Sequence, residues 1–341
     1  MTAAADALGA ARRFLAPELR AFDARWAEAL AAEAAYLAPT DHALLGAGKR
    51  LRPIVLLLAA RAASGSPATD GAVRAAVALE LMHAASLIHD DIVDRAPRRR
   101  GAPSVHAARG LEVALLLGDL QLLQALRCFA VALETPRELA LVRDVLDAGF
   151  LLCTGELDEL IAPRARPAGA AAIRARYVHG IDRKTGALFA LAGELGAALG
   201  GRDGAVRGAL GRYGTHLGRA FQLVDDLADF APAVRTGKRP LADLRAGRAT
   251  LPIALAAAAA RPRSAVRRCL AAAPRARSGA LLAAAADEIT ASTAFAHCYA
   301  DARGFALEAV RALDDVPPGD ARAILAALAH ELADRGPWEA S

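Results

Sequence analysis

The stretch AVRAAVALELMHAASLIHDDIVDRAP, at residues 72–97, decides how this chain folds. It contains no glycine, and its only proline stands at its end, so the spacing predicts one long helix that stops near Pro97. Small and apolar residues dominate it up to the acidic cluster of Asp90, Asp91 and Asp94. A helix that is apolar on nearly all sides is usually a buried one, which indicates the core of a large all-α protein.

The same helical pattern continues along the chain, because alanine and leucine dominate and alternation of β-branched residues is rare. It predicts helices at residues 51–63, 111–133, 137–152, 185–199 and 215–230, after 251, and at 281–303 and 321–334. It predicts loops at 63–71, 96–104, 163–169, 231–248, 262–278 and 316–319. No change in composition marks a boundary, so we expect residues 1–341 to form a single all-α domain, a large helical bundle or barrel with a deep central apolar cavity.

Composition and charge exclude several classes of protein. With 55% hydrophobic and 23% charged residues, the 341-residue chain is not intrinsically disordered. Charged residues interrupt its apolar runs, and its N-terminus lacks an apolar signal segment, so we expect no transmembrane segment and a cytoplasmic location. The four cysteines are scattered without CxxC spacing, which indicates neither disulfides nor zinc. The net charge of +5 is spread without interleaved aromatic residues, so we expect no nucleic-acid partner.

Two acidic segments echo each other: DDIVDRAP at residues 90–97 and DDLADFAP at residues 225–232. In each, the first and last aspartates of DDxxD lie four residues apart and share one helical face. These carboxylates repel each other and also meet the negative end of the helix dipole. Two solvated helix ends are the plain alternative, but the apolar residues upstream favour the rim of a cavity. Magnesium prefers such oxygen ligands and commonly bridges to substrate phosphates, so the clusters predict Mg²⁺ bound with a diphosphate.

Basic segments suit the other half of such a site. Of the 42 basic residues only three are lysine, namely Lys49, Lys184 and Lys238. The segments GKRLRP, at residues 48–53, and KTG, at residues 184–186, each precede or begin a predicted helix, where free N–H groups attract anions. Lys238 follows the second acidic cluster, as an arginine run follows the first. Solvated charge explains any one of these segments alone, whereas together they predict diphosphate binding.

In their order and spacing, these segments resemble the trans-isoprenyl diphosphate synthases, the polyprenyl synthetase family, over about residues 46–252. The matching features are GKRLRP (48–53), His83, DDIVD (90–94), RRG (99–101), Gly118-Asp119, KTG (184–186), FQLVDDLAD (221–229), Gly237-Lys238 and TLP (250–252). The resemblance implies an all-α homodimer in which residues 262–341 form C-terminal helices. It also implies a prenyltransferase that condenses isopentenyl diphosphate with dimethylallyl, geranyl or farnesyl diphosphate to give a trans-polyprenyl diphosphate.

Matching positions give each residue an expected role. The resemblance implies that three Mg²⁺ per active site are held by Asp90, Asp91, Asp94, Asp225, Asp226 and Asp229. It implies that the allylic diphosphate is contacted by Arg99, Lys184, Lys238, Thr185 and Gln222. It implies that isopentenyl diphosphate is bound by Lys49, Arg52, His83 and Arg100, with Arg50 nearby. Cations around the departing diphosphate would then favour ionisation of the allylic C–O bond.

Product length is expected to depend on the helix before Asp90. Short-chain members of the family carry bulky aromatic residues at the positions of Ala85 and Ser86, and the small residues here leave the path open. Leu81 and Met82 lie one turn deeper and could form a floor. Because one helical turn of about 5.4 Å is comparable with one isoprene unit, a product of geranylgeranyl length or longer is expected.

Two other functions compete with chain elongation. Class I terpene cyclases also use an aspartate-rich cluster, but they pair it with an Asn/Asp-Asp-x-x-Ser/Thr-x-x-x-Glu motif. Asp229 stands here at the hydroxyl position of that motif and Ala233 at the glutamate position, which disfavours cyclisation. A non-catalytic partner subunit of a heteromeric synthase would commonly show eroded aspartate motifs, and both motifs are intact.

Overall fold

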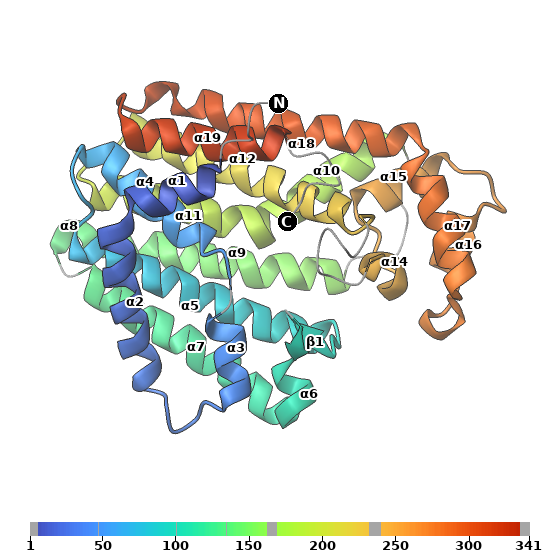
Figure 1. The fold of residues 1–341 in the computed structure, drawn as a ribbon, viewed down its shortest axis with the longest axis horizontal. Helices are drawn as coiled ribbons and strands as arrows, with labels where there is room; N and C mark the ends of the chain where they lie inside the picture. The colour runs from blue at the N-terminus through green and yellow to red at the C-terminus, as the bar shows by residue number, and fades with distance from the viewer. Residues whose placement is uncertain are drawn as a thin grey trace. The chain divides into compact units, whose positions relative to one another are not determined.

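The computed structural model describes residues 6–46, 48–99, 101–133, 135–161, 169–231 and 240–334, which are overwhelmingly helical (Figure 1). The chain divides into two compact units. The first comprises the described residues up to Phe150 together with Leu188–Gly214 and Arg311–Leu328. The second comprises Leu151–Ala187, Thr215–Val310 and the described residues from Ala329 onward.

Most elements of the first unit come from the N-terminal half of the chain. They are α1 (Ala7–Phe14), α2 (Ala16–Ala31), α3 (Pro39–Gly46), α4 (Leu51–Ser64), α5 (Asp70–Val93), β1 (Arg98–Arg99), β2 (Ala102–Pro103), α6 (Val105–Arg109), α7 (Leu111–Ala132), α8 (Pro136–Leu139), the start of α9 (Val142–Ile161), α11 (Ala187–Leu199) apart from its first residue, the start of α12 (Ala205–Ala228), the last residues of α18 (Thr293–Ala312), the 3₁₀ turn η3 (Leu313–Asp315) and most of α19 (Asp320–Asp334).

The second unit contains the remaining elements. They are the end of α9, α10 (Ala170–Ile181), the π-helical turn η1 (Asp182–Gly186), the end of α12, α14 (Ala242–Ala246), α15 (Leu251–Ala259), α16 (Ala265–Ala271), the 3₁₀ turn η2 (Pro274–Ala276), α17 (Gly279–Thr290), nearly all of α18 and the end of α19.

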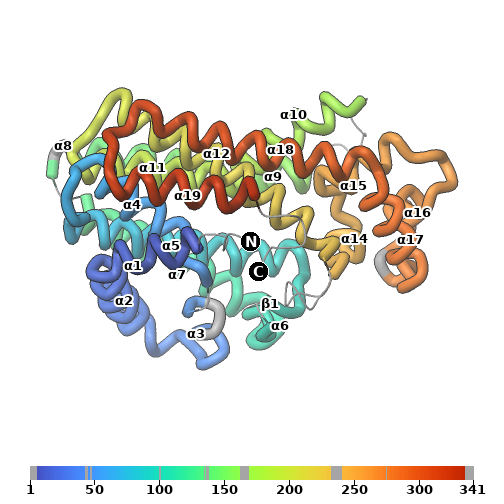
Figure 2. The backbone as a smooth tube through the Cα atoms, turned by 45° about the horizontal axis from the view of Figure 1, so that its top comes forward, coloured from blue at the N-terminus to red at the C-terminus, as the bar shows by residue number. Residues whose placement is uncertain are grey.

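Helix α5 forms the core of the first unit. It packs against α2, α4 and α7, and Figures 1 and 2 show α7 running beside it. Thr69 begins the helix, since its side-chain oxygen accepts a hydrogen bond from the Ala72 N–H at 3.2 Å. The helix ends at Val93, so the long helix predicted before Pro97 is confirmed. Its acidic cluster therefore lies at the C-terminal end of a buried helix.

Glycines allow α11 and α12 to approach each other within the same unit. A Cβ atom on Gly193 would lie 2.0 Å from the Leu210 carbonyl oxygen, and one on Gly214 would lie 2.0 Å from the Phe189 carbonyl oxygen. Neither distance is compatible with a side chain, so both positions require glycine.

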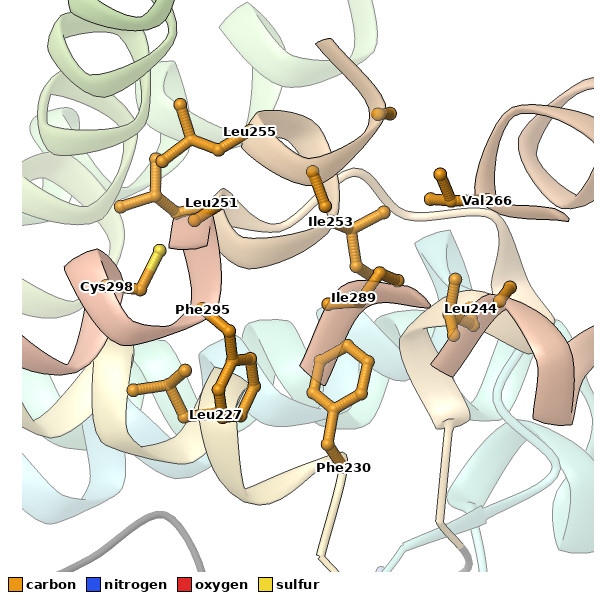
Figure 3. Close-up of a cluster of buried hydrophobic side chains, with 14 of the residues drawn as sticks. Leu227, Phe230, Leu244, Leu251, Ile253, Leu255, Val266, Ile289, Phe295 and Cys298 are labelled. Atoms are coloured by element: carbon orange, nitrogen blue, oxygen red, sulfur yellow. The ribbon is translucent and has the colours of Figure 1, made fainter. Parts of the chain in front are cut away.

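The second unit is built around a separate hydrophobic cluster (Figure 3). Leu227 and Phe230 at the end of α12 pack with residues of α14, α15, α17 and α18. The Phe230 and Phe295 rings meet edge to face, with their centroids 5.5 Å apart. This cluster fixes the end of α12, which carries the second acidic segment.

The all-α fold class predicted from the sequence is confirmed, and the differences concern element boundaries. The helix expected at 281–303 is divided into α17 and α18, because the Ser292 side chain accepts a hydrogen bond from the Phe295 N–H and starts a new helix. The helix expected at 137–152 is α8 followed by α9, which continues to Ile161. The loops expected at 231–248 and 262–278 contain α14 and α16.

A short hairpin lies within the loop expected at 96–104. Strands β1 and β2 pair antiparallel, with Arg98 opposite Pro103 and Arg99 opposite Ala102. Gly101 has φ +82° and makes the turn, a conformation that favours glycine.

Helices α5 and α7 bear on the expectation that the chain has no transmembrane segment. By length and composition alone, each could cross a membrane. In α5, however, 67% of the apolar window is buried inside the structure, which fits the core helix of a soluble protein. The corresponding share in α7 is 39%, because part of its apolar face is exposed.

A buried carboxyl group lies between the end of α2 and α7. Glu33 is 3% exposed and accepts a hydrogen bond from the amide Nε2 of Gln121, which is fully buried. The other oxygen of each side chain is buried without a hydrogen-bond partner among the described residues. Burial raises the pKa of Glu33 above its ordinary value, although its hydrogen bond to Gln121 favours the ionised form. The first unit is therefore less stable when Glu33 ionises.

We predict that Glu33→Gln raises the free energy of unfolding at pH 8 by about 1–3 kcal/mol. The amide carries no charge, and its nitrogen could donate to the unpartnered oxygen of Gln121. A carboxyl group whose pKa is raised by folding makes its full contribution to protein stability at pH values below its unfolded pKa. That contribution is lost as pH rises through the folded pKa. The gain in melting temperature should therefore grow between pH 5 and pH 8.

Glu28→Gln is the matched control, because Glu28 is an exposed glutamate on α2. It should change the melting temperature little at any of these pH values. A gain for Glu33→Gln that does not vary with pH would contradict the buried charge.

Candidate active site

The three aspartates of the first acidic cluster, at the end of α5, differ in their burial. Asp91 is 2% exposed, and one of its oxygens accepts a hydrogen bond from the Nε of Arg99 at 2.8 Å. Asp90 is half-buried and Asp94 is exposed. Because successive helical residues are turned by about 100°, Asp91 points to one side of the face that Asp90 and Asp94 share.

The environment of Asp91 fits a bound cation. Its second oxygen is buried and has no hydrogen-bond partner among the residues described. Burial raises the pKa of Asp91 despite the nearby Arg99 guanidinium, which lowers it. A proton or a metal ion would satisfy such an oxygen, and hard divalent cations prefer carboxylate ligands. Over the described ranges, however, no three metal-ligating side chains already converge on one point.

A histidine beside this cluster was missed by the sequence analysis. The His89 Nε2 lies 3.4 Å from the Asp119 carboxylate and 3.3 Å from the Leu115 carbonyl oxygen. Gly118 makes room for it, since a Cβ there would lie 2.3 Å from the His89 Nε2. The Gly118-Asp119 pair, quoted above only as a matching motif, is the sequence signal that could have revealed this histidine.

The GKRLRP segment places its cations in different surroundings. The Arg50 guanidinium lies 4.8 Å from the centre of the Phe22 ring and pairs with Asp23, so it faces α2. The Arg52 guanidinium lies 4.8 Å from the centre of the Phe189 ring. Both contacts are cation–π interactions within the first unit. The structure therefore does not bring the two guanidinium groups to a common partner.

The other residues expected to bind isopentenyl diphosphate are placed as follows. Lys49 is exposed just before α4, and His83 is half-buried on α5. Arg100 lies outside the described residues, as does Lys238, which was expected to contact the allylic diphosphate.

Three residues with a left-handed backbone adjoin the predicted site segments. Arg50, Arg95 and Leu241 have φ of 50°, 51° and 60°. This conformation costs a non-glycine residue about 1–2 kcal/mol. Arg50 begins α4, Arg95 follows the first acidic cluster, and Leu241 begins α14. Backbone strain of this kind concentrates at functional segments.

In the second unit, the middle aspartate of the second cluster is again buried. Asp226 is 6% exposed, and its two oxygens accept hydrogen bonds from the Tyr177 hydroxyl at 2.7 Å and the Gln222 amide nitrogen at 2.9 Å. Burial raises the pKa of Asp226 to about 8, although both hydrogen bonds lower it. Burial and the neighbouring carboxylate also raise the pKa of Tyr177. Asp225 is exposed.

The last aspartate of the second cluster holds the start of α14. The two carboxylate oxygens of Asp229 accept hydrogen bonds from the backbone N–H groups of Ala242, at 2.8 Å, and Asp243, at 3.0 Å. The carboxylate thereby supplies acceptors for two N–H groups that the first turn of a helix leaves unpaired.

Lys184 lies in η1, a π-helical turn between α10 and α11. Its Nζ lies 2.5 Å from Glu156 and 2.8 Å from Glu159, one turn apart on α9. Burial lowers the pKa of Lys184, but the two carboxylates outweigh burial and raise it above its ordinary value. A Cβ on Gly155 would lie 2.6 Å from the Cβ of Arg183, so this glycine allows α9 and η1 to touch. Single π-helical turns often mark functional sites.

The structure joins part of the expected allylic site into one network. The Thr185 hydroxyl donates to the Gln222 amide oxygen at 2.8 Å, and Gln222 in turn contacts Asp226. Tyr177, Glu156 and Glu159 were missed by the sequence analysis. Both glutamates lie beyond residue 152, where the helix was expected to end.

The residues expected to set product length lie on α5. Leu81, Met82 and Ala85 are buried, and Ser86 is half-buried. A Cβ on Gly149 would lie 4.0 Å from the terminal methyl of Met82, so Met82 faces α9.

Comparison with known proteins identifies the family of this chain. The family model described as Polyprenyl synthetase matches residues 33–287. The geranylgeranyl diphosphate synthase of Methanosarcina mazei is 38% identical over 207 residues, which cover 60% of this chain and 62% of that protein, less than two thirds of its length. The heptaprenyl diphosphate synthase component 2 of Geobacillus stearothermophilus is 32% identical over 94% of this chain and 97% of its own length. Other relatives are named octaprenyl and farnesyl diphosphate synthases.

A solved structure extends the likeness to the fold. The polyprenyl synthase of Caulobacter crescentus, in complex with calcium and isoprenyl diphosphate, superposes with a TM-score of 0.84 at 30% identity. The match covers 96% of this chain and 98% of that one. The family model covers well over half of the sequence, so this chain belongs to the polyprenyl synthetase family.

Proposed function

We propose that this protein elongates prenyl chains by condensing isopentenyl diphosphate with dimethylallyl, geranyl or farnesyl diphosphate. The observation that carries the proposal is the buried carboxylate of Asp91, whose second oxygen has no partner among the described residues, at the end of a core helix that also bears Asp90 and Asp94. Such an oxygen suits a divalent cation that accompanies a diphosphate. The relative solved with calcium and isoprenyl diphosphate supports the same chemistry.

Magnesium is the proposed cation, with three ions per active site held by the two aspartate clusters. When bound, it supplies positive charge that offsets the charge of the departing diphosphate. Each cluster offers carboxylate oxygens at one helix end, and these are the hard ligands that magnesium prefers.

The basic residues are proposed to divide between the two substrates. Lys184 would contact the allylic diphosphate, because an ammonium group has three N–H donors and its two glutamate partners leave one for a phosphate oxygen. Arg99 and Lys238 would contact the same diphosphate, beside Thr185 and Gln222. Isopentenyl diphosphate would be bound by Lys49, Arg52, His83 and Arg100, with Arg50 nearby.

In the proposed reaction these cations stabilise the diphosphate as the allylic C–O bond breaks. The double bond of isopentenyl diphosphate then forms a C–C bond with the allylic cation. Loss of a proton to the released diphosphate restores a double bond, and the product is longer by one isoprene unit. Apolar side chains on α5 exclude water from the cation.

We further propose a product of geranylgeranyl length or longer. Ala85 supports this, since it lies on α5 about one and a half turns before Asp90. Its small side chain would leave room there for a longer prenyl tail. The names of the relatives range from farnesyl to octaprenyl diphosphate synthases, so family membership leaves the length open.

A second copy of this chain is the proposed partner. Helices α7 and α9 expose large apolar side chains at helical spacing, including Leu116 and Leu123 on α7 and Phe150 and Leu157 on α9. Soluble proteins rarely leave such faces exposed without a partner. The relative named as a component 2 favours one alternative, a heteromeric enzyme with a different second subunit.

We also propose a cytoplasmic location and one catalytic domain. The four cysteines are free thiols, as expected of a reducing compartment. Helices α9 and α12 each contribute residues to both compact units, which supports a single domain.

Chain elongation should be measurable with the purified protein, labelled isopentenyl diphosphate, farnesyl diphosphate and Mg²⁺. We expect linear products, no turnover in excess EDTA, and a loss of roughly 100-fold or more in kcat for Asp90→Ala and Asp225→Ala. Asp287→Ala, on an exposed position of α17, is the control and should behave as wild type. Near-normal turnover in EDTA would contradict the metal, and a cyclic hydrocarbon or no product would contradict elongation.

Ala85→Phe should shorten the product to about farnesyl length, because the ring would block the path of the growing tail. Met82→Ala should leave the length unchanged or increase it. Products would be extracted and sized by chromatography. If Ala85 instead packs tightly against a neighbouring helix, the larger side chain costs about 1–3 kcal/mol of stability. A destabilised variant with the wild-type product length would contradict the pocket.

Sedimentation should give about twice the 35.2 kDa mass of one chain. Leu116→Asp should shift the protein toward the monomer, since it places a charge in the exposed face of α7. Tyr36→Asp is the control, because Tyr36 is another exposed apolar residue that lies outside α7 and α9. A monomeric wild-type protein at micromolar concentration would contradict the homodimer.

A further inference from the structure

A partly buried hydrogen-bonded chain in the second unit joins four side chains from three elements. It runs from Tyr177 on α10 to Asp226 and Gln222 on α12, and then to Thr185 in η1. Its three hydrogen bonds measure 2.7, 2.9 and 2.8 Å. Thr185 and Gln222 are both expected at the allylic diphosphate, whereas nothing in the sequence pattern pointed to Tyr177.

In its ionised form, Asp226 sets the direction of every bond in this chain. Asp226 accepts on both oxygens, so the Gln222 amide must turn its nitrogen toward Asp226. The amide oxygen of Gln222 then faces Thr185, and the Thr185 hydroxyl donates to it. The orientation of Gln222 and Thr185 therefore depends on a fixed acceptor at Asp226, which Tyr177 holds from the other side.

Asp226 differs from its neighbour Asp225 in its exposure to solvent. Its side chain is buried, while Asp225, one residue earlier, is exposed. The hydroxyl of Tyr177 and the amide of Gln222 occupy one oxygen each. A metal ion would have to compete with both donors inside the protein, whereas Asp225 presents its carboxylate on the exposed side of the helix.

We infer that Tyr177 is a positioning residue for the allylic diphosphate site, and that Asp226 is the acceptor that aligns Gln222 and Thr185 rather than a direct ligand of the metal. The inference rests on the proposed function and narrows it. Ligation by the second cluster then falls chiefly to Asp225, since both oxygens of Asp229 also accept hydrogen bonds. Tyr177 touches neither substrate nor metal and acts through Asp226.

The kinetic experiment uses Tyr177→Phe, which removes one hydroxyl and keeps the ring. The expected result is a rise of about tenfold in KM for the allylic diphosphate, as for the loss of one buried hydrogen bond. The KM for isopentenyl diphosphate should stay within about twofold, because the network reaches only Thr185 and Gln222.

Tyr213→Phe is the matched control. Tyr213 is also buried, and its hydroxyl donates to the Leu325 carbonyl oxygen at 2.8 Å in the first unit. Both variants should lower the melting temperature, but Tyr213→Phe should leave the KM for the allylic diphosphate unchanged. If Tyr177→Phe also lowers only the melting temperature, its role is structural and the proposal fails.

Metal binding supplies a test that does not need turnover. Mn²⁺ binding in the presence of inorganic diphosphate would be followed by electron paramagnetic resonance for wild type, Asp225→Asn, Asp226→Asn and Tyr177→Phe. We expect the Mn²⁺ affinity of Asp225→Asn to fall at least about tenfold below that of the wild type. The affinities of Asp226→Asn and Tyr177→Phe should stay within about twofold of the wild-type value. A loss in Asp226→Asn as large as in Asp225→Asn would make Asp226 a ligand and overturn the proposal.

The two experiments also separate this inference from the proposed function. If the wild-type protein does not elongate prenyl chains, the proposed function fails, and the Mn²⁺ titration still decides whether Asp226 is a ligand. If elongation is observed but the KM for the allylic diphosphate does not respond to Tyr177→Phe, only the inference fails.

Discussion

Electrostatic repulsion at the ends of two helices is the constraint on which the rest of this structure depends. Each DDxxD segment places three carboxylates where the helix dipole is already negative. In both, the middle aspartate turns into the protein: Asp91 meets Arg99, and Asp226 meets Tyr177 and Gln222. One carboxylate per cluster is thereby buried, while Asp90, Asp94 and Asp225 keep more of their surface exposed.

The two clusters satisfy this constraint by different chemistry. Asp91 is paired with a guanidinium, whereas both partners of Asp226 are neutral donors. Burial dominates in each case and raises both pKa values. Basic residues around η1 are in turn paired with carboxylates. Lys184 contacts Glu156 and Glu159, and Arg219 forms a bidentate pair with Asp182 at 2.6 and 2.7 Å. The protein therefore supplies counter-charges to Lys184, a group proposed to bind a diphosphate.

Local patterns in the sequence were sufficient for the fold class and for most helices. A long run rich in alanine and leucine, without glycine or proline, favours one continuous helix, and α5 ends within a few residues of the expected point. The short helices α14 and α16 lie in segments expected to be loops, because packing and capping groups such as Asp229 and Ser264 determine elements of that length. Ser292 likewise divides a helix that composition alone would have left continuous.

The sequence by itself therefore determined the all-α class, the helix that carries each acidic cluster and the spacing that puts two aspartates on one face, since all of these depend on neighbours within a few residues. Only the tertiary structure decided which aspartate is buried and which partners it meets. Tyr177 is 49 residues from Asp226, and Lys184 is 25 residues from Glu159. Contacts over such separations depend on how helices pack, and short-range periodicity carries no information about that packing.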